Sequence, residues 1–291
     1  MKQYLGYDVG GTSVKVGVVC EDASIIHHEK LPIPPTYEEF MQQLADCYHR
    51  LKVQFPAICG IGISSCGGID PDSGVVFAKL APSLEYLIGK PYFKIREMVD
   101  VPVALEKDGN CAAYGEVWCG CAQDLENFIT LVMGSGFGGS VFINGKVWKG
   151  AHFLAGDFGY TYPTPTKVSY GDMIAPVSVE RLYKEETGVF KTIPQMKETM
   201  DEDPAAKKFY LQFIDGLALG IHLPEDGVHV LDAAVGGIMD AHIQKAVGDL
   251  LLDGIHKCLV LLLMGKQMAG DLLIAGRLQV AQRNILQLPF D

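Results

Sequence analysis

Short apolar runs alternate with glycine-rich turns along the first half of the chain, and this alternation predicts an α/β fold. Runs rich in β-branched and aromatic residues indicate strands. The predicted strands are residues 4–9, 14–20, 25–31, 59–64, 101–105, 127–133, 140–143 and 228–235. Apolar residues that recur at helical spacing indicate helices. The predicted helices are residues 38–54, 94–99, 179–187, 207–219 and 241–252.

The first glycine-rich turn joins two adjacent strands and reads Asp8-Val9-Gly10-Gly11-Thr12-Ser13-Val14-Lys15. A strand on each side makes it a hairpin, whereas Rossmann and Walker loops lead into a helix. Paired glycines leave backbone N–H groups open to a close approach, so such a turn can bind phosphate. Thr12 adds a hydroxyl and Lys15 a positive charge, and Asp8 could hold Mg²⁺ directly or through water. The alternative is an ordinary tight turn.

A second turn of the same kind occurs about halfway along the chain. It reads Gly134-Ser135-Gly136-Phe137-Gly138-Gly139, and a predicted strand and an Asn144-Gly145 hairpin follow it. One glycine turn is a weak signal, but two of the same kind indicate duplicated α/β halves that bind a nucleotide.

A charged segment, Glu106-Lys107-Asp108, ends the predicted strand 101–105, and small residues typical of a helix follow. Open α/β folds bind their ligands at the carboxyl ends of strands. Amides at a helix N-terminus stabilise a carboxylate there. Asp108 is therefore a candidate catalytic base. The alternative is that Asp108 only caps the helix.

Two further loops carry candidate substrate contacts. Gly67 and Gly68 follow the strand 59–64, either as a simple turn or as a place where a ligand approaches the backbone. The loop 150–160 offers Asp157 and Tyr160 between glycines. Carboxylates that accept paired hydroxyls are suited to holding sugars, although this segment could also be a structural loop.

Composition narrows the class of protein. The chain has 291 residues, 48% of them hydrophobic, enough for one large domain or two smaller ones. A formal net charge of −11 argues against a nucleic-acid partner, which would need a basic face. The eight cysteines include no C-x-x-C pair, so we expect free thiols in a reducing compartment. With neither a signal peptide nor an apolar run of the roughly 20 residues that span a bilayer, the protein is expected to be cytoplasmic and to have no membrane partner.

Taken in order, these motifs resemble those of the ROK (repressor, ORF, kinase) family of the actin-like ATPase superfamily. The resemblance rests on Asp8-Val9-Gly10-Gly11-Thr12-Ser13-Val14-Lys15, Ser65-Cys66-Gly67-Gly68-Ile69-Asp70, Glu106-Lys107-Asp108-Gly109-Asn110, Gly134-Ser135-Gly136-Phe137-Gly138-Gly139 and Ala155-Gly156-Asp157-Phe158-Gly159-Tyr160. It implies two actin-like (ribonuclease H-like) domains around an interdomain cleft, residues 1–112, completed by a C-terminal helix, and residues 113–291. It also implies a homodimer.

Several positions depart from the family pattern. Cys66 stands where proline is usual, Lys107 replaces an asparagine that normally bonds sugar hydroxyls, and Asp157 replaces a glutamate. Tyr160 replaces a histidine that binds both sugar and zinc, and residues 161–180 contain no Cys or His, so we predict no zinc site. A branch that resembles bacterial β-glucoside kinases shares these last two features. The Lys107 cation should stabilise the Asp108 carboxylate, which weakens it as a base but could help to bind an anionic group.

The resemblance implies an ATP-dependent sugar kinase. Asp108 would act as general base toward a sugar hydroxyl, and we expect this to be the 6-hydroxyl of a hexose or β-glucoside. ATP and Mg²⁺ would bind Asp8, Lys15 and the two glycine turns, and the sugar would contact Gly67, Gly68, Lys107, Asp108, Asp157 and Tyr160. One alternative is a sugar-sensing regulatory protein without turnover. Because the chain starts at its first strand, we expect no room for the helix-turn-helix that family repressors carry. Another alternative is a degenerate kinase fold that binds ligands only.

Overall fold

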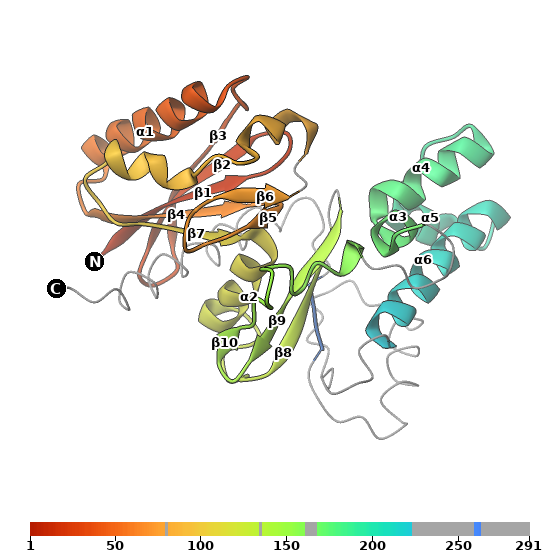
Figure 1. The fold of residues 1–291 in the computed structure, drawn as a ribbon. Helices are drawn as coiled ribbons and strands as arrows, with labels where there is room; N and C mark the ends of the chain where they lie inside the picture. Colours follow the sequence, from red (N-terminus) through yellow and green to blue (C-terminus); the bar gives the residue numbers. More distant parts are fainter. Residues whose placement is uncertain (79–80, 134–135, 161–167, 223–258, 263–291) are drawn as a thin grey trace. The chain divides into compact units, whose positions relative to one another are not determined.

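The computed structural model describes residues 1–78, 81–133, 136–160, 168–222 and 259–262 (Figure 1). The described residues fall into two compact units. The first consists of Met1–Leu125 and Lys149–Leu154, and the second of Glu126–Trp148 and the described residues from Ala155 onward. The strand predicted at 228–235 and the helix predicted at 241–252 lie outside the described residues.

A five-stranded sheet in the order β3-β2-β1-β4-β7 forms the centre of the first unit. Its strands are β1 (Gln3–Val9), β2 (Val14–Cys20), β3 (Ile25–Leu31), β4 (Ile58–Ser65) and β7 (Val103–Lys107). The first three strands form antiparallel hairpins, whereas β4 runs parallel to β1 and β7 parallel to β4. These are the strands that the apolar runs predict, and the hairpin around Gly10 is confirmed. The last strand differs in its bounds: β7 begins and ends two residues later than the predicted strand 101–105 and includes Glu106 and Lys107.

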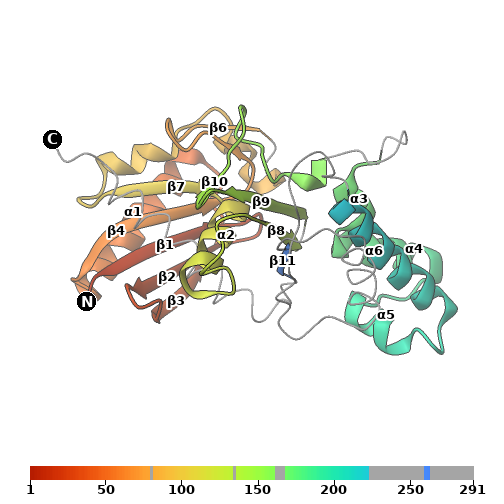
Figure 2. The same cartoon turned by 90° about the horizontal axis from the view of Figure 1, so that it is seen from below.

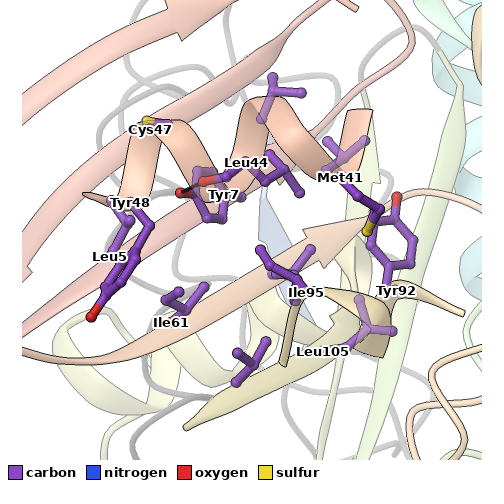
Figure 3. Packing of buried hydrophobic residues seen from close by; sticks show 14 of the residues in the cluster. Leu5, Tyr7, Met41, Leu44, Cys47, Tyr48, Ile61, Tyr92, Ile95 and Leu105 are labelled. Carbon is purple, nitrogen blue, oxygen red and sulfur yellow. Dashed lines mark hydrogen bonds between the residues drawn. The ribbon is translucent and has the colours of Figure 1, made fainter. Parts of the chain in front are cut away.

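Helices cover both faces of this sheet: α1 (Tyr37–Gln54) lies on one face and α2 (Asp108–Cys119) on the other, as two perpendicular views show (Figures 1 and 2). The Thr36 side chain accepts a hydrogen bond from the Glu39 amide and so begins α1. The apolar face of α1 packs on the sheet, where Leu44 and Tyr48 are completely buried with Leu5 and Ile61 (Figure 3). The Tyr7 hydroxyl donates to the Leu44 carbonyl at 2.7 Å, which satisfies a polar atom inside this core.

Four short elements complete the first unit. They are the hairpin β5 (Gly68–Ile69) and β6 (Val76–Ala78) and the 3₁₀ helices η1 (Pro82–Leu87) and η2 (Tyr92–Glu97). The helix predicted at 94–99 is thus a 3₁₀ helix that begins two positions earlier, directly after Pro91.

The second unit combines a four-stranded sheet in the order β10-β9-β8-β11 with a group of helices. Its elements are β8 (Phe128–Met133), β9 (Phe137–Ile143), β10 (Lys146–Val147), η3 (Phe158–Tyr160), α3 (Tyr170–Ile174), α4 (Pro176–Thr187), α5 (Ile193–Thr199), α6 (Pro204–His222) and β11 (Leu259–Leu262). The core includes Leu131 of β8, Phe137 of β9, Tyr183 of α4 and Phe213 of α6. The prediction that β9 begins at residue 140 is wrong: Gly138 and Gly139 already pair with β8.

Two properties of the whole chain can be checked in the described part. None of the helices found there has the length and apolar character needed to cross a bilayer. The seven cysteines found there are free thiols, of which only Cys121 is exposed.

Candidate active site

The carboxyl ends of β1, β4 and β7 bring the predicted site residues of the first unit to one edge of the sheet. Because these strands are parallel neighbours, Asp8 lies beside Ser64, and Ser64 beside Glu106. The Gly67-Gly68 turn leaves β4, and Asp108 follows β7 directly. Ligands of open α/β sheets bind at such an edge. The structure therefore assembles this part of the predicted site from three separate segments.

Asp108 is the first residue of α2, and Lys107 occupies the N-cap position without a side-chain cap hydrogen bond. The Asp108 Oδ1 atom accepts a hydrogen bond from the Gly109 N–H at 2.7 Å. The carboxylate thus satisfies one of the first-turn amides that a helix leaves unbonded, and the helix dipole favours its charge. Asp108 is half-buried, whereas Lys107 is only 3% exposed. Asp108 contributes to helix capping and also remains accessible at the sheet edge.

Asp8 and Asp108 both influence the Cys66 thiol, so both lie on its side of the sheet edge. Burial raises the pKa of the Cys66 thiol to about 11, and the negative charges of Asp108 and Asp8 add to the rise. Cys66 follows β4, the strand between β1 and β7. Two carboxylates, one from β1 and one directly after β7, therefore influence the same thiol.

Glu106 organises the strand-to-helix junction beneath Asp108. Its carboxylate is almost fully buried, at 2% residue exposure. Oε1 accepts hydrogen bonds from the Lys107 N–H and the Asn110 Nδ2, each at 2.9 Å, and Oε2 lies 3.2 Å from Lys149 Nζ. Sequence reasoning named Glu106 only as part of a charged segment and missed Lys149. No local pattern reveals a partner that lies so far along the chain.

Hydrogen bonding and packing explain part of the sequence of the first glycine turn. The Gly10 N–H donates to the Ser13 carbonyl at 3.1 Å and closes the turn. A Cβ on Gly11 would lie 2.6 Å from the Ala81 Cβ, so this glycine is required by packing. Asp8, at 7% exposure, pairs with Lys15, whose Nζ lies 3.2 Å from Asp8 Oδ2.

The residues at the first glycine turn could supply only part of the coordination shell of Mg²⁺. Mg²⁺ prefers oxygen ligands and is commonly held by one or two carboxylates together with substrate phosphates and waters. Asp8 offers such an oxygen at the end of β1. In the described part of the chain, no group of three or more acidic, histidine or cysteine side chains could hold a metal. Phosphate and water would have to supply most of the ligands.

The Gly67-Gly68 turn also has local structural requirements. Gly67 has a φ of 94°, in the left-handed region that favours glycine. A Cβ on Gly68 would lie 2.7 Å from the Ala78 Cβ and 2.8 Å from the Phe77 ring. Both glycines are therefore explained by the β5–β6 hairpin, and a role in sugar binding remains a prediction.

In the second unit, glycines join β9 to the loop that carries Asp157 and Tyr160. A Cβ on Gly159 would lie 2.1 Å from the Phe137 carbonyl oxygen, and one on Gly156 would lie 2.6 Å from that of Gly139. Only glycines allow so close a backbone approach. The half-buried Asp157 and the exposed Tyr160 are thereby held beside the second glycine motif.

The glycines of the second motif differ in whether neighbouring atoms leave room for a side chain. A Cβ on Gly139 would lie 1.9 Å from the Thr130 carbonyl oxygen, so strand packing explains this residue. The space beside Gly136 and Gly138 is open, because a Cβ at either residue would have no atom within 4 Å of it. Gly134 and Ser135 lie outside the described residues. Within this motif, Gly136 and Gly138 are the described glycines that packing does not explain.

Comparisons with known proteins agree with this arrangement of motifs. A model of the ROK family matches residues 4–172. The chain is 28% identical over 235 residues to a β-glucoside kinase of Listeria innocua, covering 74% of this chain and 76% of that protein.

Solved structures match over nearly the whole chain. A ROK family protein from Streptococcus pneumoniae in complex with sucrose has a TM-score of 0.78 and 22% identity, covering 98% of this chain and 99% of the other. A ROK family glucokinase from Streptomyces griseus in complex with glucose and AMPPNP has a TM-score of 0.75 and 21% identity, covering 97% and 99%. At these identities the likeness establishes the mixed α/β fold.

Proposed function

This chain belongs to the ROK family, and we propose that it is an ATP-dependent sugar kinase that transfers the γ-phosphoryl group to a sugar hydroxyl, with Asp108 as general base. The observation that carries the proposal is the convergence of Asp108, Asp8 and the first glycine hairpin at the carboxyl edge of one sheet. The β-glucoside kinase among the relatives supports a hexose or β-glucoside as acceptor. We propose the 6-hydroxyl of that sugar as the group that is phosphorylated.

Phosphoryl transfer depends mainly on positioning and on stabilising charge, and the proposed residues divide these tasks. Asp108 accepts the proton of the sugar hydroxyl, a contribution of about 10²–10⁴-fold for general-base catalysis. Because the Gly10 amide is used within its own turn, the amides of Gly11 and Thr12 are the better candidates for phosphate. When bound, Mg²⁺ would offset phosphate charge, with Asp8 as its protein ligand.

The remaining predicted contacts complete the proposal. Lys15 offsets phosphate charge beside Asp8, and Gly136 and Gly138, together with Gly134, Ser135 and Gly139, form the second phosphate motif. The sugar contacts Gly67, Gly68, Lys107, Asp157 and Tyr160. A zinc site is not expected, and a homodimer stays a prediction of the family resemblance.

The substitution Asp108→Asn tests the proposed base. The amide keeps the size of the side chain and can still accept a hydrogen bond from the Gly109 N–H, but it cannot take a proton. We expect kcat to fall by at least about 10²-fold while most of the sugar affinity remains. A coupled ADP assay measures the first effect and isothermal titration the second. Near-normal turnover in this variant would show that Asp108 is not the base.

The acceptor is identified by an ATP-consumption screen. Glucose, cellobiose, other β-glucosides, N-acetylhexosamines and N-acetylmannosamine form the neutral panel. Uronic acids test whether Lys107 favours an anionic group. A 6-deoxy analogue of the best acceptor should bind without being phosphorylated if transfer is to the 6-hydroxyl. Failure of every sugar to stimulate ADP formation, despite binding, would favour a regulatory or binding protein without turnover.

A further inference from the structure

We propose that Lys149 is a positioning residue: it holds the buried Glu106 carboxylate, which in turn fixes the strand-to-helix junction that carries Asp108. This inference rests on the kinase function proposed above. Lys149 Nζ lies 3.2 Å from Glu106 Oε2, and the lysine comes from the segment Lys149–Leu154, far along the chain from β7. Lys149 is not part of the motifs that carry the proposed chemistry.

Glu106 restrains the backbone on both sides of Asp108. One of its donors is the Lys107 N–H, directly before Asp108, and the other is the Asn110 side chain in the first turn of α2. Both hydrogen bonds end on the same atom, Oε1, and leave Oε2 for Lys149. The orientation of the Glu106 carboxylate therefore determines how β7 turns into α2, and Asp108 lies at that turn.

The charge of Glu106 makes the lysine necessary. A carboxylate with a side-chain exposure of 3% has lost nearly all its hydration, and such a charge is costly unless it is paired and hydrogen-bonded. Lys149 supplies the opposite charge and keeps 30% of its own side chain exposed, so its ammonium group retains water. Without Lys149, Glu106 would have to turn toward other donors or water. The hydrogen bonds around Asp108 would change with it.

The charge of Lys149 also has a smaller influence on Asp70, near the predicted sugar-side turn. The hydrogen bond from Ser73 is the main cause that lowers the pKa of Asp70, and the positive charge of Lys149 contributes to the same shift. Asp70 accepts hydrogen bonds from the backbone of the turn after β5, which carries Gly68. One cation thus lies near both the Asp108 junction and the predicted sugar-side turn. The same segment leads directly to the loop with Asp157.

The test compares Lys149→Met with Lys149→Arg, Glu106→Gln and the double variant Glu106→Gln/Lys149→Met. Lys94→Met is the matched control, because Lys94 also pairs with a glutamate of the first unit, but at the surface. We expect Lys149→Met to lower kcat by about 10–100-fold, the range that a small misplacement of a reacting group can produce. KM values for ATP and sugar should stay within about threefold, since ground-state binding is retained. Lys149→Arg should restore most of the rate, and Lys94→Met should change nothing.

Two further measurements separate positioning from a general loss of stability. If Lys149 acts through the charge of Glu106, the double variant should be no slower than the slower single variant, because the interaction is removed only once. Hydrogen exchange at the junction of β7 and α2 should become faster in Lys149→Met but not in Lys94→Met. This readout needs no turnover.

The outcomes distinguish this inference from the proposed function. An active wild-type enzyme whose Lys149→Met variant keeps its kcat and its exchange pattern would overturn the role of Lys149 alone. Additive losses in the double variant, or no rescue by arginine, would do the same. A wild-type protein that phosphorylates no sugar would overturn the kinase proposal, and faster exchange in Lys149→Met would then still support the structural link from Lys149 to the junction.

Discussion

The position of the Asp108 carboxylate is compatible with both of the roles that sequence reasoning treated as alternatives. It accepts a hydrogen bond from the Gly109 amide at the start of α2, and it also lies at the edge of the sheet where a ligand could reach it. The hydrogen bond from the Gly109 N–H orients the carboxylate, and a general base must also be oriented toward the proton that it accepts. For this residue, a structural role is therefore no argument against a catalytic one.

Cys66 should be a slow nucleophile despite its place in the candidate site. Its pKa is raised to about 11, so at pH 8 the reactive thiolate is rarer by about 100-fold than for a thiol with a pKa of 9. We expect iodoacetamide to label Cys66 about 100-fold more slowly in the folded protein than in urea, with a rate that rises steadily up to pH 11. Mass spectrometry of the Cys66 peptide measures both rates. Equal rates at pH 8 would contradict the burial and the nearby negative charges.

Lys107 should influence which sugars are accepted. It is almost fully buried next to Asp108, and the family resemblance implies asparagine at this position. We expect Lys107→Asn to shift the ratio of kcat/KM toward neutral over anionic sugars by about fivefold, the contribution of a modest ion pair. Lys52→Asn, at the end of α1, is a control outside the site. An unchanged ratio would show that the cation does not face the acceptor.

Among the elements, the contact between β9 and the loop of η3 depends on glycines that allow two backbones to touch. We expect Gly159→Ala to destabilise the protein by about 1–3 kcal/mol, the usual cost of overpacking, because its Cβ would meet the Phe137 carbonyl oxygen. Gly136→Ala is the matched control, since the space beside it is open. Thermal unfolding measures both. If Gly159→Ala is as stable as Gly136→Ala, the loop does not pack on β9 in this way.

Substitutions at Gly136 and Gly159 should also differ in their effects on the binding of ATP and sugar. Gly136→Ala should leave the fold intact but weaken the binding of ATP if the second glycine motif approaches phosphate, since its Cβ would occupy the open space. Gly159→Ala should displace the loop with Asp157, and so affect the sugar more than ATP. Titration with each ligand distinguishes these results from a uniform loss of both.

Elements with a strong local pattern were predictable from the sequence. The helix α1 has apolar residues at helical spacing, and β1, β2 and β3 are apolar runs between turns, so their predicted positions are confirmed. The start of β9 was missed because Gly138 and Gly139 are poor strand formers and were interpreted as a turn. Their pairing with β8 overrides that local preference.

Contacts between distant segments were not predictable in the same way. The Glu106–Lys149 pair and the packing of Ala81 on Gly11 each join parts of the chain with no shared local pattern. The motifs did predict which segments carry the candidate site, because strand ends and glycine turns have local signatures. They could not predict which glycines are required by packing, since that depends on neighbours far away in the sequence.

At the scale of the whole molecule, the residues proposed to bind phosphate belong to two units with separate cores. The first glycine motif, with Asp8 and Lys15, belongs to the first unit, whereas Gly136 and Gly138 belong to the second. Each unit has a hydrophobic cluster of its own. Two-state unfolding is therefore not expected of the protein without ligands. We predict two transitions in calorimetry of the free protein.

If both glycine motifs bind the same nucleotide, that nucleotide should stabilise both transitions. In the presence of Mg²⁺, a non-hydrolysable ATP analogue at 100 times its Kd should stabilise the folded protein by about 2.7 kcal/mol. This stabilisation is lost as soon as any part of the binding site unfolds. Both transitions should move to higher temperature and approach each other, and Asp8→Asn should reduce the shift if Asp8 holds Mg²⁺. An analogue that moved one transition and left the other unchanged would place the nucleotide in a single unit. If that unit were the first, the second glycine motif would lose its proposed phosphate role, and the open space beside Gly136 and Gly138 would need another explanation.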